Sequence, residues 1–270
     1  MPERTIATLA RMAVLTALCL AAAQIPLTAQ TTGNENDAWL TQTVRLYYFS
    51  AKAGLKGFDC AVRPDWHAFY SSAGSMSAEN EQRAALLSRV GIMLHARMKG
   101  GSTMDWNPPA ESLSADQTSV LSQMHDALNQ TIVDGFLQFW TPFIENTVIP
   151  DSSSGMEMST TSAGGRKVHL KQTDIELDET FDSDRILRQY NIVMSSARIK
   201  LTPTYAPSAQ VLIISHFHAT IQPTGSENVQ EMNVDVQYQT IGGYPLPTHV
   251  VMEVTGVATL HFALEGCTVQ

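Results

Sequence analysis

The pattern of hydrophobic and polar positions changes once along the chain. Between residues 37 and 145, apolar side chains recur at intervals of three and four residues, the period of an amphipathic helix. Between residues 156 and 270, apolar and polar side chains alternate in short runs separated by Gly, Pro, Asp and Ser. The sequence therefore predicts a helix-rich part, 37–145, followed by a strand-rich part, 156–270.

The longest predicted helix begins at Ser114 and ends near Trp140. Ser114 and Gln117 form a capping-box signature, and Pro142 is expected to stop the helix. Its apolar positions form one continuous face: Val120, Leu121, Met124, Leu128, Ile132, Phe136 and Phe139. Shorter helices are predicted around residues 39–49, 64–70 and 79–90. The long helix is the expected cover for a sheet.

Seven runs in the second part have the alternation of strands. They are Lys167–Gln172, Asp174–Asp178, Ile192–Leu201, Gln210–Ile221, Asn233–Thr240, His249–Thr255 and Ala258–Leu264. Strands that follow one another without a long connection pair antiparallel, and a single short helix is expected around Asp182–Arg188. Two further strand candidates, Phe58–Val62 and Gly91–Ala96, lie among the helices. The expected fold class is α+β: one domain over residues 30–270, with a curved antiparallel sheet covered by the N-terminal helices.

Residues 1–29 have the three parts of a secretory signal peptide. Arg4 and Arg11 form a basic flank, Met12–Ala23 is an apolar run, and small residues follow at two candidate cleavage positions. The apolar run has about a dozen residues, whereas a transmembrane helix needs about 20. We expect a mature protein that is periplasmic or secreted and has no transmembrane anchor after cleavage. The alternative is an uncleaved N-terminal anchor.

Removal of that segment, with Cys19 in its apolar run, leaves Cys60 and Cys267. An exported protein permits a disulfide, which would close a loop of about 200 residues and stabilise the fold by about 4–5 kcal/mol. The alternative is two buried free thiols, because Cys is among the most buried residue types.

Charge and motifs exclude several functions. The net charge of −9 disfavours binding to the phosphate backbone of nucleic acids. The chain has no GxSxG elbow, no HExxH or CxxC metal motif and no phosphate-binding glycine loop. No catalytic residues and no cofactor are therefore predicted, and the chain is interpreted as non-enzymatic.

His216 and His218 are weak candidates for metal ligands. Two residues apart on a strand, they are expected to share one face with Leu212 and Ile214. A later strand would have to supply the third ligand. The alternative is a pair of partly exposed sheet histidines. Asp174, Glu176 and Asp178 also alternate along a strand and are interpreted as a solvated face.

The strand-rich part resembles the lipoprotein-carrier superfamily of LolA-, LolB- and LppX-like proteins. The resemblance rests on Tyr238, Gly242-Gly243 and Leu246-Pro247 before the strand His249–Val254, and on the preceding hairpin of long strands. It covers residues 156–269, less than half of the chain. It implies an incomplete barrel with helices in its mouth, which encloses an apolar cavity for lipid or lipoprotein acyl chains and carries no catalytic residues.

Three functional hypotheses follow. The first is an exported protein that binds a lipid or other apolar ligand in a cavity of the sheet, lined by residues of the long helix and one strand: Val120, Met124, Leu128, Ile132, Phe136, Leu212 and Ile214. The second is a cell-envelope structural or interaction module with a filled core and an exposed apolar patch. The third is a hydrolase whose Ser or His meets a carboxylate in a cleft. The sequence leaves the ligand, the partner and the oligomeric state open.

Overall fold

The computed structural model describes residues 35–74, 76–145, 147–208 and 211–270. The predicted signal peptide, residues 1–29, lies outside the described residues. Within the described ranges, no helix is both long enough and apolar enough to cross a membrane.

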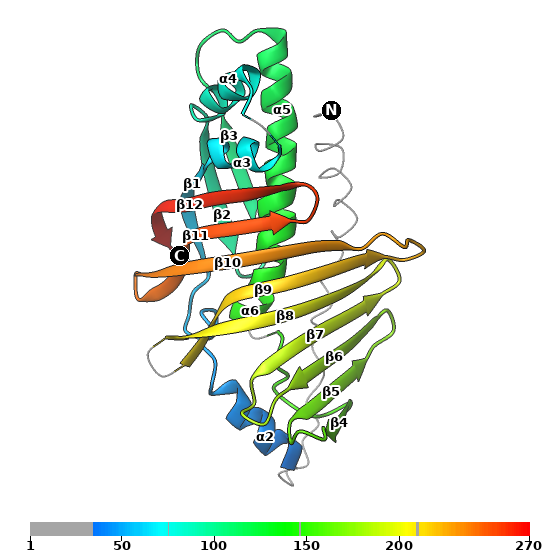
Figure 1. Cartoon of the computed structure of the whole chain (residues 1–270). Coiled ribbons are helices and arrows are strands. Elements are labelled where there is room, and N and C mark those ends of the chain that lie inside the picture. The colour runs from blue at the N-terminus through cyan, green and yellow to red at the C-terminus, as the bar shows by residue number, and fades with distance from the viewer. Residues whose placement is uncertain (1–34, 75, 146, 209–210) are drawn as a thin grey trace. The chain divides into compact units, whose positions relative to one another are not determined.

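The chain forms one open antiparallel sheet of twelve strands (Figure 1). Its order is β3-β2-β1-β12-β11-β10-β9-β8-β7-β6-β5-β4. The strands are β1 (Gly57–Pro64), β2 (Gly91–Arg97), β3 (Thr103–Asn107), β4 (Met156–Thr160), β5 (Arg166–Lys171), β6 (Ile175–Phe181), β7 (Leu187–Met194), β8 (Ala197–Ser208), β9 (Val211–Pro223), β10 (Gln230–Ile241), β11 (Tyr244–Val254) and β12 (Ala258–Val269). The α+β class with an antiparallel sheet is confirmed.

All described helices precede residue 146. They are α2 (Glu35–Val44), α3 (Trp66–Ser72), α4 (Ala78–Leu87), α5 (Ala115–Asn129), the π-helix η2 (Gln130–Leu137) and α6 (Gln138–Glu145). The described chain divides into two compact units. The first unit contains Ser50–Thr141 and Asn233–Gln270, and the second contains residues 35–49 and Pro142–Met232. That the two form a single domain stays a prediction.

In the first unit, the long helix packs on the sheet through aromatic side chains. The rings of Phe136 and Trp140 stack with centroids 5.6 Å apart, and Phe136 meets Phe262 of β12 edge-on at 5.8 Å. Phe58 of β1 meets Trp140 at 6.2 Å. Phe58, Phe136 and Trp140 have no exposed surface. The Trp140 indole Nε1–H donates a 2.8 Å hydrogen bond to the Tyr238 hydroxyl, so the buried indole keeps a polar partner.

The helix differs from its prediction in two ways. The capping box of Ser114 and Gln117 is present, but residues Gln130–Leu137 form a π-helix instead of continuing the α-helix. The helical path also passes Pro142, which lies inside α6, so the expected end near Trp140 is wrong. Trp140 and Ile144, on either side of the proline, are buried. Tertiary packing therefore holds a helical segment that local propensity disfavours.

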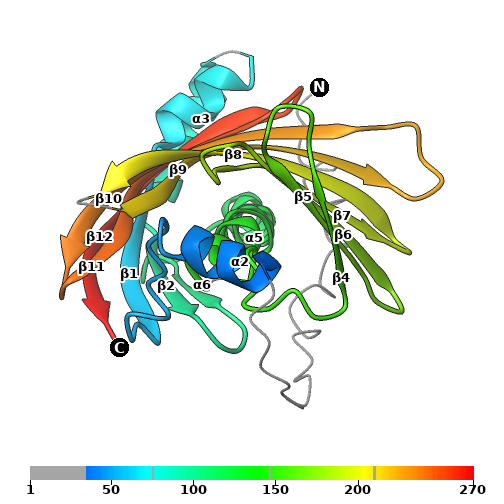
Figure 2. The ribbon, with the colours of Figure 1, turned by 90° about the horizontal axis from the view of Figure 1, so that it is seen from below.

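In the second unit, α2 lies inside the curve of the strands (Figure 2), and α2 and the segment after it contact β6 and β9. Trp39 meets Phe181 of β6 edge-on at 5.2 Å, and Leu40 is fully buried. The helix predicted around residues 39–49 is wrong beyond Val44. There the backbone pairs with β9: the N–H of Tyr48 donates to the Leu212 carbonyl at 2.9 Å, and the Leu212 N–H donates to the Leu46 carbonyl at 2.7 Å.

The strand predictions need three corrections. The run Ile192–Leu201 is two strands, β7 and β8, with a turn at residues 195–196. The helix expected around Asp182–Arg188 is a turn, in which the Asp182 carboxylate accepts hydrogen bonds from two backbone N–H groups. Leu246-Pro247, expected between strands, lies buried within β11, and the turn is made by Gly242-Gly243.

The pairing of β1 with β12 joins the early strands to the last one. Asp59 pairs with Thr268 and Ala61 with Glu265, so β12 has one extra residue between these pairs. At this bulge Gly266 has a φ of 57°, a left-handed conformation that glycine adopts without strain. The bulge lies opposite Cys60, which is fully buried and forms a disulfide bond with Cys267, 207 residues later.

Opening this disulfide should destabilise the chain strongly. In the chain-entropy model, releasing a loop of this length lowers the free energy of unfolding by about 5 kcal/mol. We expect urea unfolding of the double variant C60S/C267S, or of the reduced protein, to have a midpoint well below that of the oxidised protein. In the protein unfolded without reductant, iodoacetamide should label neither Cys60 nor Cys267. Labelling of both thiols would rule the bond out.

Candidate functional site

A narrow apolar pocket lies in the first unit, between α3, the α5–η2 helix and the β11–β12 hairpin. Its lining includes two residues from each: Trp66 and Phe69, Met124 and Leu128, and Met252 and Leu260. The cavity volume is about 20 Å³, enough for a water-sized group. Because pockets for small molecules measure about 300–1,000 Å³, the pocket is closed to a whole ligand in this conformation.

The helix α3 is the pocket's outer wall, and β12 holds it at both ends. Before the helix, the backbone N–H of Asp65 donates to the His261 carbonyl at 2.8 Å, while the Asp65 carboxylate caps the helix through Ala68 N–H. At the other end, the Ser72 hydroxyl accepts a 2.9 Å hydrogen bond from the Thr259 N–H. A few polar contacts therefore position this wall.

The long helix changes type where it borders the pocket. Thr131, in the first turn of the π-helix, lines the pocket and donates its hydroxyl to the Ala127 carbonyl at 2.7 Å. The adjacent Gln130 has a buried side-chain oxygen, Oε1, without a hydrogen-bond partner. π-Helical segments are rare and recur at functional sites. The change from α-helix to π-helix therefore makes this part of the helix a candidate for a functional role.

The structure brings together part of the cavity that the sequence predicts. Met124 and Leu128 line the pocket, whereas Ile132 and Phe136 are fully buried in the core, and Val120 is half-buried outside it. Leu212 and Ile214 belong to the second unit, where Ile214 is buried and Leu212 half-buried. Phe69 and Met252 were missed, because only long-range pairing brings their elements to the helix.

His216 and His218 do not share a face with Leu212 and Ile214 as expected. The register of β8 and β9 shifts between the pairs Thr204–His216 and Tyr205–Ile214. This bulge reverses the alternation, so Ile214 is buried like Phe217, while both histidines stay half-exposed. Within the described part of the chain, neither histidine belongs to a group of three metal-ligating side chains.

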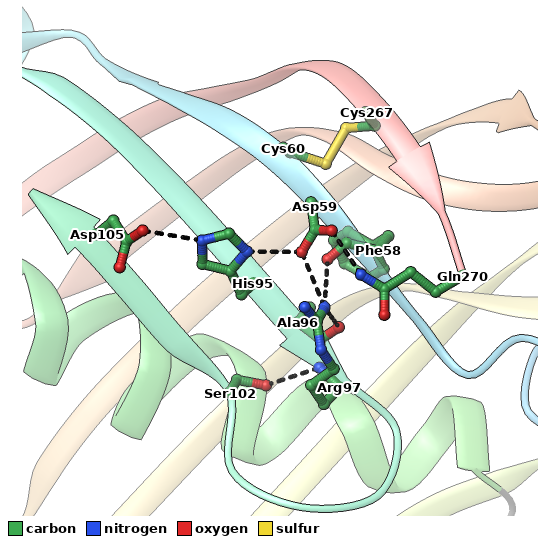
Figure 3. A network of polar contacts seen from close by, with 10 residues as sticks. All are labelled: Phe58, Asp59, Cys60, His95, Ala96, Arg97, Ser102, Asp105, Cys267 and Gln270. Atoms are coloured by element: carbon green, nitrogen blue, oxygen red, sulfur yellow. Dashed lines mark hydrogen bonds and ion pairs between the residues drawn. A yellow bond between two sulfur atoms is a disulfide. The ribbon is translucent and has the colours of Figure 1, made fainter.

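A polar network lies on β1, β2 and β3, beside the disulfide (Figure 3). His95 bridges two carboxylates: its Nδ1 lies 2.7 Å from Asp59 Oδ1, and its Nε2 lies 3.2 Å from Asp105 Oδ2. Arg97 donates to Asp59 Oδ1 at 2.9 Å, and the side chain of Gln270 donates to Asp59 Oδ2. Three strands and the C-terminal residue are thus joined by side chains.

The network shifts two pKa values in opposite directions. Desolvation works against ionisation of Asp59, but hydrogen bonds from His95, Arg97 and Gln270 outweigh it and lower the pKa of Asp59. The hydrogen bond to Asp59 raises the pKa of His95. Ser102 accepts from the Arg97 backbone N–H instead of contacting His95. The hydrogen bonds of this network join β1 to β2 and β2 to β3.

A second polar feature is buried in the second unit. Glu179 of β6 lies opposite Tyr190 of β7 and is only 4% exposed. Its Oε2 and the hydroxyl of Tyr205 are buried without hydrogen-bond partners. The neighbouring Tyr47 hydroxyl is satisfied, since it donates to the Arg185 carbonyl and accepts from Leu187 N–H. Burial raises the pKa of Glu179 well above its ordinary value.

Comparison with known proteins gives no relative: no family model, no curated protein and no solved structure matches this chain. The candidate sites are therefore judged on their geometry and chemistry.

The buried Glu179 makes stability depend on pH. Because its pKa is higher in the folded than in the unfolded state, the folded state keeps the proton longer, and stability falls as the pH rises above about 4.5. The slope is at most about 1.4 kcal/mol per pH unit. We expect E179Q to lack this slope and to exceed the wild type in stability at pH 8, measured by urea unfolding. E231Q, at an exposed position, is the matched control; equal pH profiles for E179Q and the wild type would contradict the assignment.

Proposed function

We propose that the mature chain is an exported, non-enzymatic protein that binds an apolar ligand such as a lipid acyl chain. The observation that carries the proposal is the pocket between α3, α5 and the β11–β12 hairpin, whose lining is almost entirely apolar. Met124 and Leu128, two residues that the sequence assigns to a ligand cavity, contribute to it. Such a lining suits a hydrocarbon chain.

Binding requires the pocket to open, because about 20 Å³ does not hold an acyl chain. In this proposal α3 is the element that moves. It is a short helix of seven residues, and hydrogen bonds to β12 hold it at its two ends, so few contacts have to break when it moves. Met124 and Met252 are unbranched and flexible, so they can reshape the lining around a guest. The ligand then stabilises a minor, open conformation.

The two other hypotheses have less support. An interaction module would present an exposed apolar patch, but the large hydrophobic side chains exposed among the described residues are Met93 and Val229, one in each unit. A hydrolase needs a Ser or His beside a carboxylate in a cleft. His95 lies beside two carboxylates, Asp59 and Asp105, but none of these three residues lines the apolar pocket. Ligand binding is therefore the preferred function.

Filling the pocket should weaken ligand binding. Ala127 lines the pocket and is 7% exposed, so A127F places an aromatic ring in the space that the ligand would take. We expect a dansyl-labelled fatty acid to bind the mature wild type and to bind A127F at least tenfold more weakly. A115F is the control, because Ala115 is exposed at the start of the same helix. Circular dichroism checks that each variant is folded.

Two results would end this proposal: no saturable binding of the labelled fatty acid, or equal affinity for the folded A127F variant and the wild type. Native mass spectrometry of protein purified from an envelope fraction without detergent supplies the ligand's identity. A bound mass that extracts into organic solvent supports the proposal, and an apo mass at monomer size counts against it.

Export is part of the proposal and has its own test. Its support is the leader-like sequence of residues 1–29 and a disulfide, which is the rule in oxidising compartments and rare in the cytosol. We expect N-terminal sequencing of the protein from cells to start between residues 24 and 30, next to Ala23 or Ala29. Recovery of an intact N-terminus from the cytoplasmic fraction would contradict export.

A further inference from the structure

Three side chains of the kinds that bind metal ions lie close together on one face of the β5–β6 hairpin in the second unit. His169 of β5 lies opposite Asp178 of β6, and Lys171 lies opposite Glu176. Glu176 and Asp178 are two residues apart, so both project to the side of the sheet that His169 occupies. All three side chains are half-buried, which leaves them accessible from solvent while restricting their motion.

Their spacing is close to that of a metal site. One ligand atom from each of His169, Glu176 and Asp178 lies within 4.8 Å of the others, and His169 Nδ1 is 2.9 Å from Asp178 Oδ1. Ligands of a tetrahedral Zn²⁺ ion, at bond lengths of about 2.0–2.2 Å, are separated from one another by about 3.3–3.6 Å. Small side-chain rotations on a fixed hairpin are enough to close this difference.

The neighbouring strands extend the same row of groups. Glu157 of β4 lies opposite His169, and Asn191 of β7 lies opposite Asp178. The row from β4 to β7 thus consists of a carboxylate, an imidazole, a carboxylate and an amide. The carboxylates of Glu157, Glu176 and Asp178 around His169 make this face of the hairpin negatively charged, which favours a bound cation.

Lys171 forms an ion pair with one carboxylate of the cluster, and this pair is weak. The Lys171 ammonium lies 4.0 Å from Glu176 Oε2, and the Lys171 side chain is 75% exposed. An exposed ion pair of this kind contributes about 0–1 kcal/mol and is screened by salt. A divalent ion that coordinates both carboxylates displaces it readily.

We propose that His169, Glu176 and Asp178 form a binding site for a divalent transition-metal ion, with Zn²⁺ as the best match. An imidazole with carboxylates suits zinc, whereas Ca²⁺ and Mg²⁺ favour sites made of oxygen ligands alone. Three protein ligands and partial exposure leave a coordination position for water. The site goes beyond the proposed ligand binding, lies on other residues and does not depend on it.

To test this, the mature protein is first treated with a chelator to remove bound metal. It is then titrated with zinc, and binding is measured by isothermal titration calorimetry. We expect one saturable site per chain and a rise in melting temperature with zinc. H169A should weaken binding at least tenfold, and E176Q, a smaller change on the exposed hairpin, should weaken it in the same direction. The double variant H216A/H218A is the matched control, since it removes two half-exposed strand histidines outside the cluster.

The possible results separate clearly. Saturable binding that H169A and E176Q weaken and H216A/H218A leaves intact supports the site. Binding that H169A and E176Q leave unchanged, loss of binding in H216A/H218A, or only weak uptake of several ions without saturation overturns it. E176Q alone decides the matter if H169A fails to fold by circular dichroism.

Discussion

The pairing of β1 with β12 is the interaction on which the first unit depends. It joins residues about 200 positions apart in the sequence and connects the β1–β3 strands to the β11–β12 hairpin. The entropy lost in closing so long a loop is largely recovered through the contacts that the pairing allows. These contacts include the Phe58–Trp140 and Phe136–Phe262 aromatic pairs, and the α3 wall of the apolar pocket.

Two carboxylates show how the position on a strand decides the state of a side chain. Asp59 faces outward on β1, where three donors surround it and hold it ionised. Glu179 is buried on β6 with an oxygen that no donor reaches, so its neutral form is favoured. Both residues lie on strands in which polar and apolar positions alternate. Asp59 strengthens the sheet through hydrogen bonds, whereas Glu179 lowers the stability of the fold as the pH rises.

Local signals could be predicted from the sequence, and signals that depend on distant partners could not. The capping box at Ser114 and the alternation of the later strands are local, and both are present. The bulge in β9 is set by its pairing with β8, so the faces of Ile214 and His216 were assigned wrongly. For the candidate pocket, helical period sufficed for Met124 and Leu128. Trp66 and Met252 come close to them only through the sheet order, which no short window of sequence contains.

The two edges of the sheet have a consequence for self-association. Edge strands offer unpaired backbone groups to other chains and are a common start of aggregation. Here the edges are β3 and β4, each only five residues long, and each has an exposed carboxylate, Asp105 on β3 and Glu157 on β4. Strands this short and this polar make poor templates for a further strand. The sheet of twelve strands can therefore remain open while its edges disfavour the addition of strands from other chains and the formation of fibrils.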